Sequence, residues 1–275
     1  MSEYLGFKEV TLSDEELALI YQKTPGYNLG CIENEYLVVH NKSGEAVDHF
    51  RWDGSQFVQV PFKQINSRFC GKVKPRNTQQ RLAIDMLYNP EITINMLGGK
   101  FGTGKTFIMA TTAMDLIEKG KYEKLVYVRN NIEVKDSKPI GFIPGDKDDK
   151  LLPFAMPLAD NIGGPEALKM MISQGSIETV HFGQIRGRDF KNSIIMCSEV
   201  ENMTKEHIQL LIGRVGEGSV LWLDGDVKQV DMEVFRRNSG MQIALERLSG
   251  HHRFGYVKLL KTERSETAAM ADLLD

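Results

Sequence analysis

The segment Gly99-Lys100-Phe101-Gly102-Thr103-Gly104-Lys105-Thr106 decides the fold of this 275-residue chain. It matches the pattern G-x-x-x-x-G-K-[ST], and it lies between an apolar run at residues 92–97 and a helical pattern at residues 105–119. The glycines let the backbone curl so that successive N–H groups face one centre, and the following helix N-terminus adds positive potential there. The segment therefore predicts a loop that binds phosphate groups.

The side chains of this loop have predicted tasks as well. We expect Lys105 to reach the β- and γ-phosphates of a nucleotide and the Thr106 hydroxyl to ligate Mg²⁺. The alternative is a glycine turn with a surface lysine, and the strand before the loop and the helix after it argue against that alternative. The predicted phosphate-binding residues are Gly99, Gly102, Thr103, Gly104, Lys105 and Thr106.

Around the loop, helical patterns alternate with short apolar runs from residue 76 onward. Strands are predicted at residues 92–97, 125–128, 177–182, 193–197, 220–223 and 256–260. Helices are predicted at residues 78–88, 105–119, 205–215, 241–248 and 266–274, with a further helical stretch near 154–173. Uninterrupted apolar runs suit strands that are covered on both faces. The pattern predicts an α/β fold, a mainly parallel sheet with helices on both faces. Together with the phosphate loop, it predicts a fold of the P-loop NTPase (RecA-like) type.

The first 62 residues have a different pattern. Ser13-Asp14-Glu15-Glu16 is a capping-box sequence, which predicts a short helix through Tyr21. Residues 36–39, 46–50 and 56–60 read as strands separated by turn sequences. We therefore expect a helix plus a small antiparallel β module at 1–62, a linker at 63–75 and a P-loop ATPase core at 76–275.

Composition narrows the class of protein. Hydrophobic residues make up 41% and charged residues 26%, which excludes a disordered tail, a collagen and a coiled coil. The formal net charge is −3, so the overall charge does not indicate binding to nucleic acid or membrane. Three scattered cysteines form no disulfide framework, the histidines have no zinc-site spacing, and no apolar run approaches about 20 residues. We expect a soluble, cytoplasmic protein.

A glutamine just upstream of the first core strand suggests which base the nucleotide carries. The side chain of Gln80 can both accept from and donate to the N6/N7 edge of adenine, and so select ATP. The other reading of Gln80 is an exposed helix residue.

Two later strands end in polar residues that suit the same site. The strand at 193–197 is followed by Ser198 and Glu199, where P-loop ATPases carry an Asp for Mg²⁺ and often a Glu that activates water. Ser198 lacks the charge that holds the ion, and the pair also reads as an ordinary strand end. Asp226 or Gln229 could sense the γ-phosphate, and Asp226 could supply the missing charge. Arg264 could act as an arginine finger in its own or a neighbouring subunit, or be a solvated residue.

Taken together, these motifs resemble the PhoH family, P-loop ATPases related to superfamily 1 helicases, over about residues 72–275. The Gly-Phe-x-Pro-Gly-Asp loop and the Arg-Gly-Arg triplet are the more specific ones. The motifs are Arg76-Asn77-Thr78-Gln79-Gln80-Arg81, Gly99 to Thr106, Gly141-Phe142-Ile143-Pro144-Gly145-Asp146, Arg186-Gly187-Arg188, Glu199-Val200-Glu201-Asn202 and Gly225-Asp226 with Gln229 and Asp231. The β module also resembles the one in family members that begin with a PIN nuclease domain, and we expect no such domain here.

The resemblance implies ATP binding and hydrolysis, a ring-like assembly that we expect to be a hexamer, and a role in RNA metabolism or unwinding. By motif position, Gln80 would contact adenine, Gly102 to Thr106 the phosphates and Mg²⁺, Glu199 the attacking water and Gln229 the γ-phosphate. Relatives read Asp-Glu-Ala-Gln-Asn where this chain has residues 198–202 as Ser-Glu-Val-Glu-Asn. Lys100-Phe101 also replace small loop residues, and Ser265 replaces the histidine of a Val-Arg-His-type motif.

Three functions are compatible with these residues. The first is an ATPase that remodels nucleic acid, with RNA as the first candidate and single-stranded nucleic acid as a wider class. The basic residues Arg186, Arg188, Lys135, Lys138 and Lys147 could touch its phosphates or form a solvated face. The second is an ATP-binding assembly switch that turns over slowly, suggested by Ser198. The third is a small-molecule kinase, which fits the later motifs poorly.

Overall fold

The computed structural model describes residues 3–129, 155–230, 235 and 237–263. Its centre is a six-stranded sheet in which every neighbouring pair is parallel, with the strand order β12-β7-β11-β10-β8-β9. The strands are β7 Ile94–Gly98, β8 Lys124–Arg129, β9 Ile177–His181, β10 Ser193–Ser198, β11 Val220–Gly225 and β12 Phe254–Lys258. This order places β11 between β7 and β10, which matters for the site described below.

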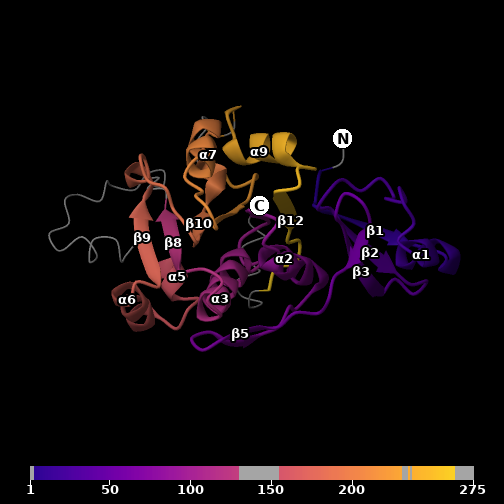
Figure 1. Cartoon of the computed structure of the whole chain (residues 1–275), viewed down its shortest axis with the longest axis horizontal. Helices are drawn as coiled ribbons and strands as arrows, with labels where there is room; N and C mark the ends of the chain where they lie inside the picture. The colour runs from indigo at the N-terminus through magenta and orange to yellow at the C-terminus, as the bar shows by residue number, and fades with distance from the viewer. Residues whose placement is uncertain (1–2, 130–154, 231–234, 236, 264–275) are drawn as a thin grey trace, which may run out of the picture.

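Helices cover both faces of this sheet, as Figure 1 shows. The helices are α2 Thr78–Tyr88, α3 Lys105–Glu118, α5 Met156–Ala159, α6 Pro165–Ser173, α7 Lys205–Ile212 and α9 Gly240–Leu248. Helices α2, α3, α5 and α6 lie on one side, and α7 and α9 lie on the other. The α/β fold class predicted from the sequence is confirmed.

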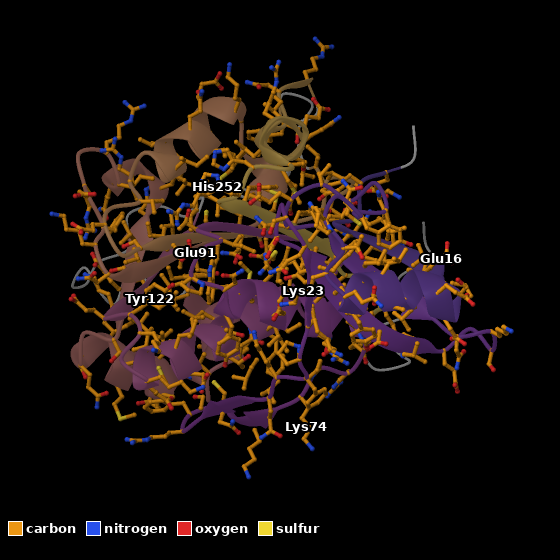
Figure 2. All side chains as sticks on the ribbon, turned by 45° about the vertical axis from the view of Figure 1, so that its right-hand side comes forward. Glu16, Lys23, Lys74, Glu91, Tyr122 and His252 are labelled. Atoms are coloured by element: carbon orange, nitrogen blue, oxygen red, sulfur yellow. The ribbon has the colours of Figure 1, made fainter. Side chains whose placement is uncertain are left out.

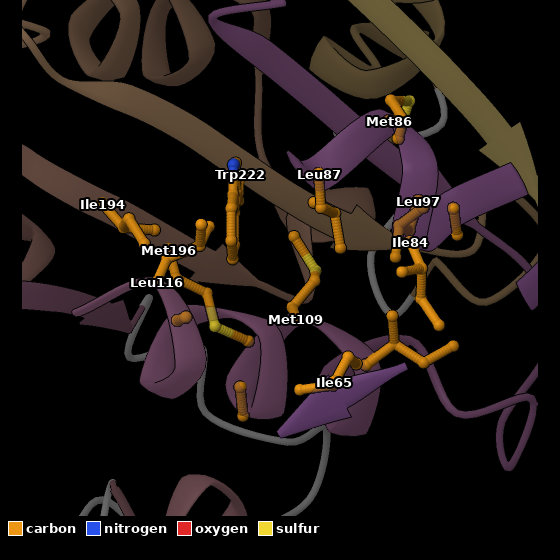
Figure 3. Packing of buried hydrophobic residues seen from close by; sticks show 14 of the residues in the cluster. Ile65, Ile84, Met86, Leu87, Leu97, Met109, Leu116, Ile194, Met196 and Trp222 are labelled. Atoms are coloured by element: carbon orange, nitrogen blue, oxygen red, sulfur yellow. The ribbon is translucent and has the colours of Figure 1, made fainter. Parts of the chain in front are cut away.

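The two faces are built by alternation along each strand. On β7, Leu97 packs with Met109 of α3 and Trp222 of β11, whereas its neighbour Met96 packs in the cluster of Met241 on the opposite face. Figure 3 shows part of the first of these clusters, with Leu97, Met109 and Trp222 labelled. Both faces are therefore apolar, which explains the uninterrupted apolar runs in the sequence.

The predicted helix near 154–173 is divided in two. Helix α5 ends at Ala159, and α6 begins after Gly163 and Gly164, whose φ angles of 100° and 93° suit glycine. The helix predicted at 266–274 lies outside the described residues.

The N-terminal module is a four-stranded sheet of order β1-β2-β3-β4 with one helix. Its elements are β1 Phe7–Thr11, α1 Asp14–Tyr21, β2 Tyr36–His40, β3 Ala46–Trp52 and β4 Phe57–Gln59. Strands β2, β3 and β4 are antiparallel as predicted, and the Ser13–Glu16 capping box is present. Strand β1 is absent from the sequence prediction and pairs parallel to β2, with Phe7 opposite Tyr36. Because the two strands are far apart in the chain, no local turn sequence marks their pairing.

The segment predicted as a linker forms a hairpin. Its strands β5 Ile65–Ser67 and β6 Gly71–Val73 are antiparallel, and Ile65 is buried with the apolar side chains of α3. The Ser67 hydroxyl donates a hydrogen bond of 2.8 Å to Glu118 Oε1, at the end of α3. Strands of three residues show no periodicity in a sequence, so this hairpin depends on packing against α3.

The N-terminal module docks on the core through apolar packing, in which Phe7 and Val38 join the cluster of Ile84, and through polar contacts. Asp85 of α2 accepts hydrogen bonds from Lys63 Nζ at 2.7 Å and from the Tyr36 hydroxyl at 3.2 Å. Asn34 Nδ2 donates to the carbonyl oxygen of Phe254, the first residue of the edge strand β12, at 3.0 Å. Outside these contacts, charged side chains such as Glu16 and Lys74 point away from the protein (Figure 2). Across the described ranges, none of the helices is long and apolar enough to cross a membrane.

Candidate nucleotide-binding site

The loop between β7 and α3 has the backbone that the glycine pattern predicts. Gly99, Gly102 and Gly104 have φ angles of 137°, 74° and 90°, which side chains other than hydrogen rarely permit. A Cβ at Gly99 would lie 2.3 Å from the carbonyl oxygen of Leu259, so no larger residue fits there. Helix α3 begins at Lys105, directly after the loop, and its first N–H groups have no partner within the helix. This arrangement suits an anion at the start of α3.

Lys105 and Thr106 begin this helix and make different contacts. The Lys105 ammonium donates hydrogen bonds to the carbonyl oxygens of Gly99 and Lys100, at 3.0 Å for the latter, so it folds back over its own loop. The Thr106 hydroxyl donates a hydrogen bond of 3.0 Å to Oδ2 of Asp224, the fifth residue of β11. Thr103 is buried, and its hydroxyl donates to the Lys100 carbonyl oxygen at 3.0 Å.

Among the described residues, two cavities adjoin the loop. The first has a volume of about 270 Å³ and contains the predicted phosphate-side groups. Its lining residues include Phe101, Lys105, Thr106, Ser198, Glu199, Glu201, Asp224, Asp226 and Gln229. The second has a volume of about 600 Å³ and is lined by the hairpin end, Gln80 and Glu263. Gly102, Gly104 and Phe107 line both, so the two cavities share the loop as a common wall.

Gln80 is buried on the second, larger cavity. Its Oε1 accepts a hydrogen bond from the Arg76 N–H at 2.9 Å, and its Nε2 donates to the Thr103 carbonyl oxygen at 3.2 Å. Each amide atom retains a further hydrogen-bonding position. The structure thus brings Gln80 beside the loop and onto the larger cavity.

Ser198, Glu199 and Asp224 meet at the carboxyl end of the sheet. Ser198 ends β10 and is the register partner of Asp224 on β11, and both are buried. Glu199 follows with φ 60° and ψ 40°, a left-handed conformation that non-glycine residues adopt rarely and that is found at functional sites. Its side chain lines the smaller cavity.

Asp226 and Gln229 lie on the loop after β11 and line the same cavity. Asp226 is buried, and its Oδ1 accepts a hydrogen bond from the Lys228 N–H at 3.0 Å. The Gln229 N–H donates to the Asp226 carbonyl oxygen at 2.9 Å, which closes a tight turn. Both candidates therefore face the site, while Asp224 is the carboxylate that contacts Thr106.

Two carboxyl groups of this site were not among the predicted site residues. Asp224 appears in the sequence only as a polar strand end, and its contact with Thr106 spans 118 positions of the chain. Glu201 is buried, and its Oε2 accepts a hydrogen bond from the Asp226 N–H at 3.2 Å. Burial raises the pKa of Glu201 to about 8, and the nearby charge of Asp224 adds to the rise. Burial also raises the pKa of Asp224, opposed by the Lys105 ammonium.

Several predicted residues are placed elsewhere or not described. Arg264, Asp231, the segment 141–146 and Lys135, Lys138 and Lys147 lie outside the described residues. Arg188 forms an ion pair with Glu178 at 2.6 Å and lies over the Phe190 ring, so it has a structural partner. Arg186 is exposed.

The residues present fit a nucleotide with Mg²⁺. A glycine loop at a helix N-terminus, a lysine and a threonine are the groups that hold phosphates and a cation in such loops. Asp224 Oδ1 is buried and has no hydrogen-bond partner among the described residues, which suits a nearby cation. In the same part of the chain, no group of three His, Cys, Asp or Glu side chains could form a metal site by itself. A cation here would depend on the bound phosphates as well as on Thr106.

Comparisons with known proteins give a consistent family match. A family described as "PhoH-like protein" matches residues 72–272. Protein PhoH2 of Bacillus subtilis is 37% identical over 212 residues, covering 74% of this chain and 48% of that protein. A PhoH-like protein of Synechocystis is 30% identical, covering 62% of this chain and 52% of the other. The chain spans about half the length of these relatives.

Solved structures with similar folds were also found. Pif1 helicase from Candida albicans has a TM-score of 0.39 and 14% identity, covering 74% of this chain and 44% of that chain. The large terminase from a thermophilic bacteriophage, in complex with ADP, has a TM-score of 0.42 and 12% identity, covering 72% of this chain and 49% of the other.

Proposed function

We propose that this chain, which belongs to the PhoH family, is an ATPase that hydrolyses Mg²⁺-bound ATP in the cavities beside its phosphate loop. The observation that carries the proposal is the position of Lys105 and Thr106 at the start of α3. They line one cavity together with Glu199 and Asp224. An ammonium, a hydroxyl and carboxylates around one cavity are groups that phosphoryl transfer to water uses.

The roles of the residues follow from their places. The N–H groups of the loop and the Lys105 ammonium hold the phosphates, and Thr106 holds Mg²⁺, which neutralises developing charge when bound. Glu199, which lines the same cavity, would orient and deprotonate the attacking water. Gln229 also lines this cavity and would contact the γ-phosphate. Gln80 contacts adenine from the larger cavity.

Arg264 keeps the proposed role of an arginine finger. Glu263, the residue before it, donates its N–H to the Gly102 carbonyl oxygen at 2.8 Å, and its Oε1 accepts from Asn77 Nδ2 at 2.8 Å. The chain next to Arg264 is thus anchored on the loop, which supports a role at the phosphates in the same or a neighbouring subunit.

ATP hydrolysis would drive the remodelling or unwinding of nucleic acid, with RNA as the first candidate. The active form would be a ring-shaped homo-oligomer, and we expect a hexamer. Family membership is the support for this part of the proposal. The alternative, a slowly hydrolysing assembly switch, was suggested by the neutral Ser198. Asp224, which is hydrogen-bonded to Thr106, supplies a carboxylate where Ser198 has none. The neutral Ser198 is therefore a weaker argument for slow hydrolysis, and we favour an active ATPase.

Phosphate release and oligomeric mass test the proposal together. We expect the 275-residue chain to hydrolyse ATP, and RNA or single-stranded DNA to increase the rate. This increase should become smaller as salt is added, because protein contacts with the nucleic-acid backbone release counterions and weaken at high salt. Lys105→Ala is the inactive control. Absence of hydrolysis with intact ATP binding would favour the switch, and hydrolysis unaffected by any nucleic acid would remove the remodelling step.

A further inference from the structure

The strand next to the phosphate loop supplies a carboxylate to the cation side of the site. Thr106 donates its hydroxyl proton to Asp224 Oδ2 at 3.0 Å. Because a hydroxyl has one proton and two lone pairs, this bond leaves the lone pairs of Thr106 for a cation. Among the described residues, Asp224 is the side-chain acceptor of the Thr106 proton, so it sets the direction in which Thr106 can coordinate.

The second oxygen of Asp224 is buried without a partner. The residue is 3% exposed, and Oδ1 has no hydrogen-bond partner in the described ranges. The Ser198 hydroxyl, which also has no partner there, is near enough to favour the charged form of the carboxyl and so to lower its pKa. An unpaired oxygen of a buried carboxylate is costly unless a charge or donor satisfies it. A divalent cation with its hydration shell, held between Thr106 and a bound phosphate chain, is the kind of group that satisfies such an oxygen.

The neighbouring strand carries a hydroxyl at the matching position. Ser198 on β10 is the register partner of Asp224 on β11, so their side chains project from adjacent strands about 5 Å apart. The pair contains one carboxylate, and it lies on β11, whereas the sequence pattern placed the metal-side group on β10. Asp226 Oδ1 accepts from the Lys228 N–H, and its Oδ2, like Asp224 Oδ1, is buried without a partner in the described ranges. Glu201 accepts from the Asp226 N–H. The hydrogen bond from Thr106 is what distinguishes Asp224 from Asp226.

We propose that Asp224 is the residue that positions Mg²⁺ against Thr106, and that the metal-side carboxylate of this site has moved from β10 to β11, with Ser198 as its neutral neighbour. This inference rests on the proposed nucleotide site. In this proposal Asp224 acts by orienting Thr106 and the cation and does not contact the nucleotide. Loss of Asp224 should therefore change how strongly Mg²⁺ tightens nucleotide binding, more than it changes binding without Mg²⁺.

Titration of a fluorescent ATP analogue, in excess Mg²⁺ and in EDTA, tests the inference without any turnover. For the unaltered chain we expect tighter binding in Mg²⁺. For Asp224→Asn, which keeps the shape of the side chain, we expect binding in EDTA to be retained and the tightening by Mg²⁺ to fall at least tenfold. Glu166→Gln on α6, whose side chain is 88% exposed, is the charge control and should keep the full Mg²⁺ effect.

A second variant exchanges the two partners. Ser198→Asp combined with Asp224→Ser returns the carboxylate to β10, and we expect it to recover much of the Mg²⁺ effect that Asp224→Ser alone loses. Recovery in the double variant would show that a chain with both substitutions still folds. Poor folding would then not explain the loss of the Mg²⁺ effect in Asp224→Ser.

The outcomes separate the two proposals. Full Mg²⁺ tightening in Asp224→Asn, or its loss in Asp226→Asn with Asp224→Asn unaffected, overturns the role of Asp224 and leaves the nucleotide site standing. No binding of the analogue by the unaltered chain, with or without Mg²⁺, overturns the nucleotide site and this inference with it.

Discussion

The side-chain amide of Gln80, at the start of α2, donates a hydrogen bond of 3.2 Å to the carbonyl oxygen of Thr103 in the phosphate loop. The same side chain accepts a hydrogen bond from the Arg76 N–H at 2.9 Å. One buried amide thus ties the segment before α2 to the loop before α3. Gln80 therefore contributes to the shape of the loop as well as facing the larger cavity.

Substitution of Gln80 by alanine should affect both roles. We expect Gln80→Ala to weaken ATP binding roughly tenfold, since each lost hydrogen bond is worth about 1 kcal/mol, and to reduce the preference for ATP over GTP. Competition of ATP and GTP against a fluorescent analogue measures both effects. If the affinity falls and the preference does not change, Gln80 shapes the loop, and adenine is recognised by another group.

Lys105 should be needed for tight nucleotide binding. Lys105→Ala removes an ammonium group from a cavity that the phosphates are proposed to occupy, and charge-assisted hydrogen bonds contribute about 1.5–3 kcal/mol each. We therefore expect ATP affinity to fall by roughly ten- to a hundredfold, measured by the same titration. Lys121→Ala, an exposed lysine beyond α3, is the matched control. Equal affinities for Lys105→Ala and the control would contradict the role of Lys105.

Glu201 should make the stability of the chain depend on pH. Its pKa is raised from 4.5 to about 8 by burial, so the folded chain keeps its proton over a range where the unfolded chain loses it. Folding stability from this group is fully present below pH 4.5 and is lost as pH rises toward 8. Gln does not ionise, so the unfolding free energy of Glu201→Gln should rise relative to that of the unaltered chain between about pH 5 and 8, by on the order of a few kcal/mol.

Urea unfolding at about pH 5 and pH 8, without nucleotide or Mg²⁺, measures this difference for Glu201. The exposed Glu166→Gln variant should show the same pH dependence as the unaltered chain. A stability gain of Glu201→Gln that is equal at both pH values would show that the carboxyl group of Glu201 does not hold its proton.

Asp85 should be important for docking of the N-terminal module. Its side chain accepts from Lys63 and Tyr36 and lies 4.0 Å from Arg51 Nε. Asp85→Ala leaves cationic groups at a largely buried position without their acceptor, so we expect a loss of about 3 kcal/mol in unfolding free energy. Tyr36→Phe removes one hydrogen bond and should cost about 1 kcal/mol. Thermal or urea unfolding measures both, and equal effects would argue against the ionic network.

Much of the fold was predictable because its signals are local. The bounds of α2 at Thr78–Tyr88 match the prediction, since an Asn cap, an apolar face and a following Asn-Pro pair are contiguous in the chain. Strand β1 and the hairpin β5–β6 were missed, because each is short and is stabilised by segments distant in sequence. The division of the helical stretch at Gly163 and Gly164 was missed although glycines mark it.

The sequence by itself determined the phosphate loop, the strand and helix on either side of it, and the parallel sheet, because glycine spacing, apolar runs and helix caps act between neighbouring residues. Tertiary structure decided which carboxylate meets Thr106. Packing places β11 beside β7, and this strand order brings Asp224 to a hydroxyl 118 positions away. The order of strands in a sheet depends on which faces pack together across the whole core, and no local pattern contains that information.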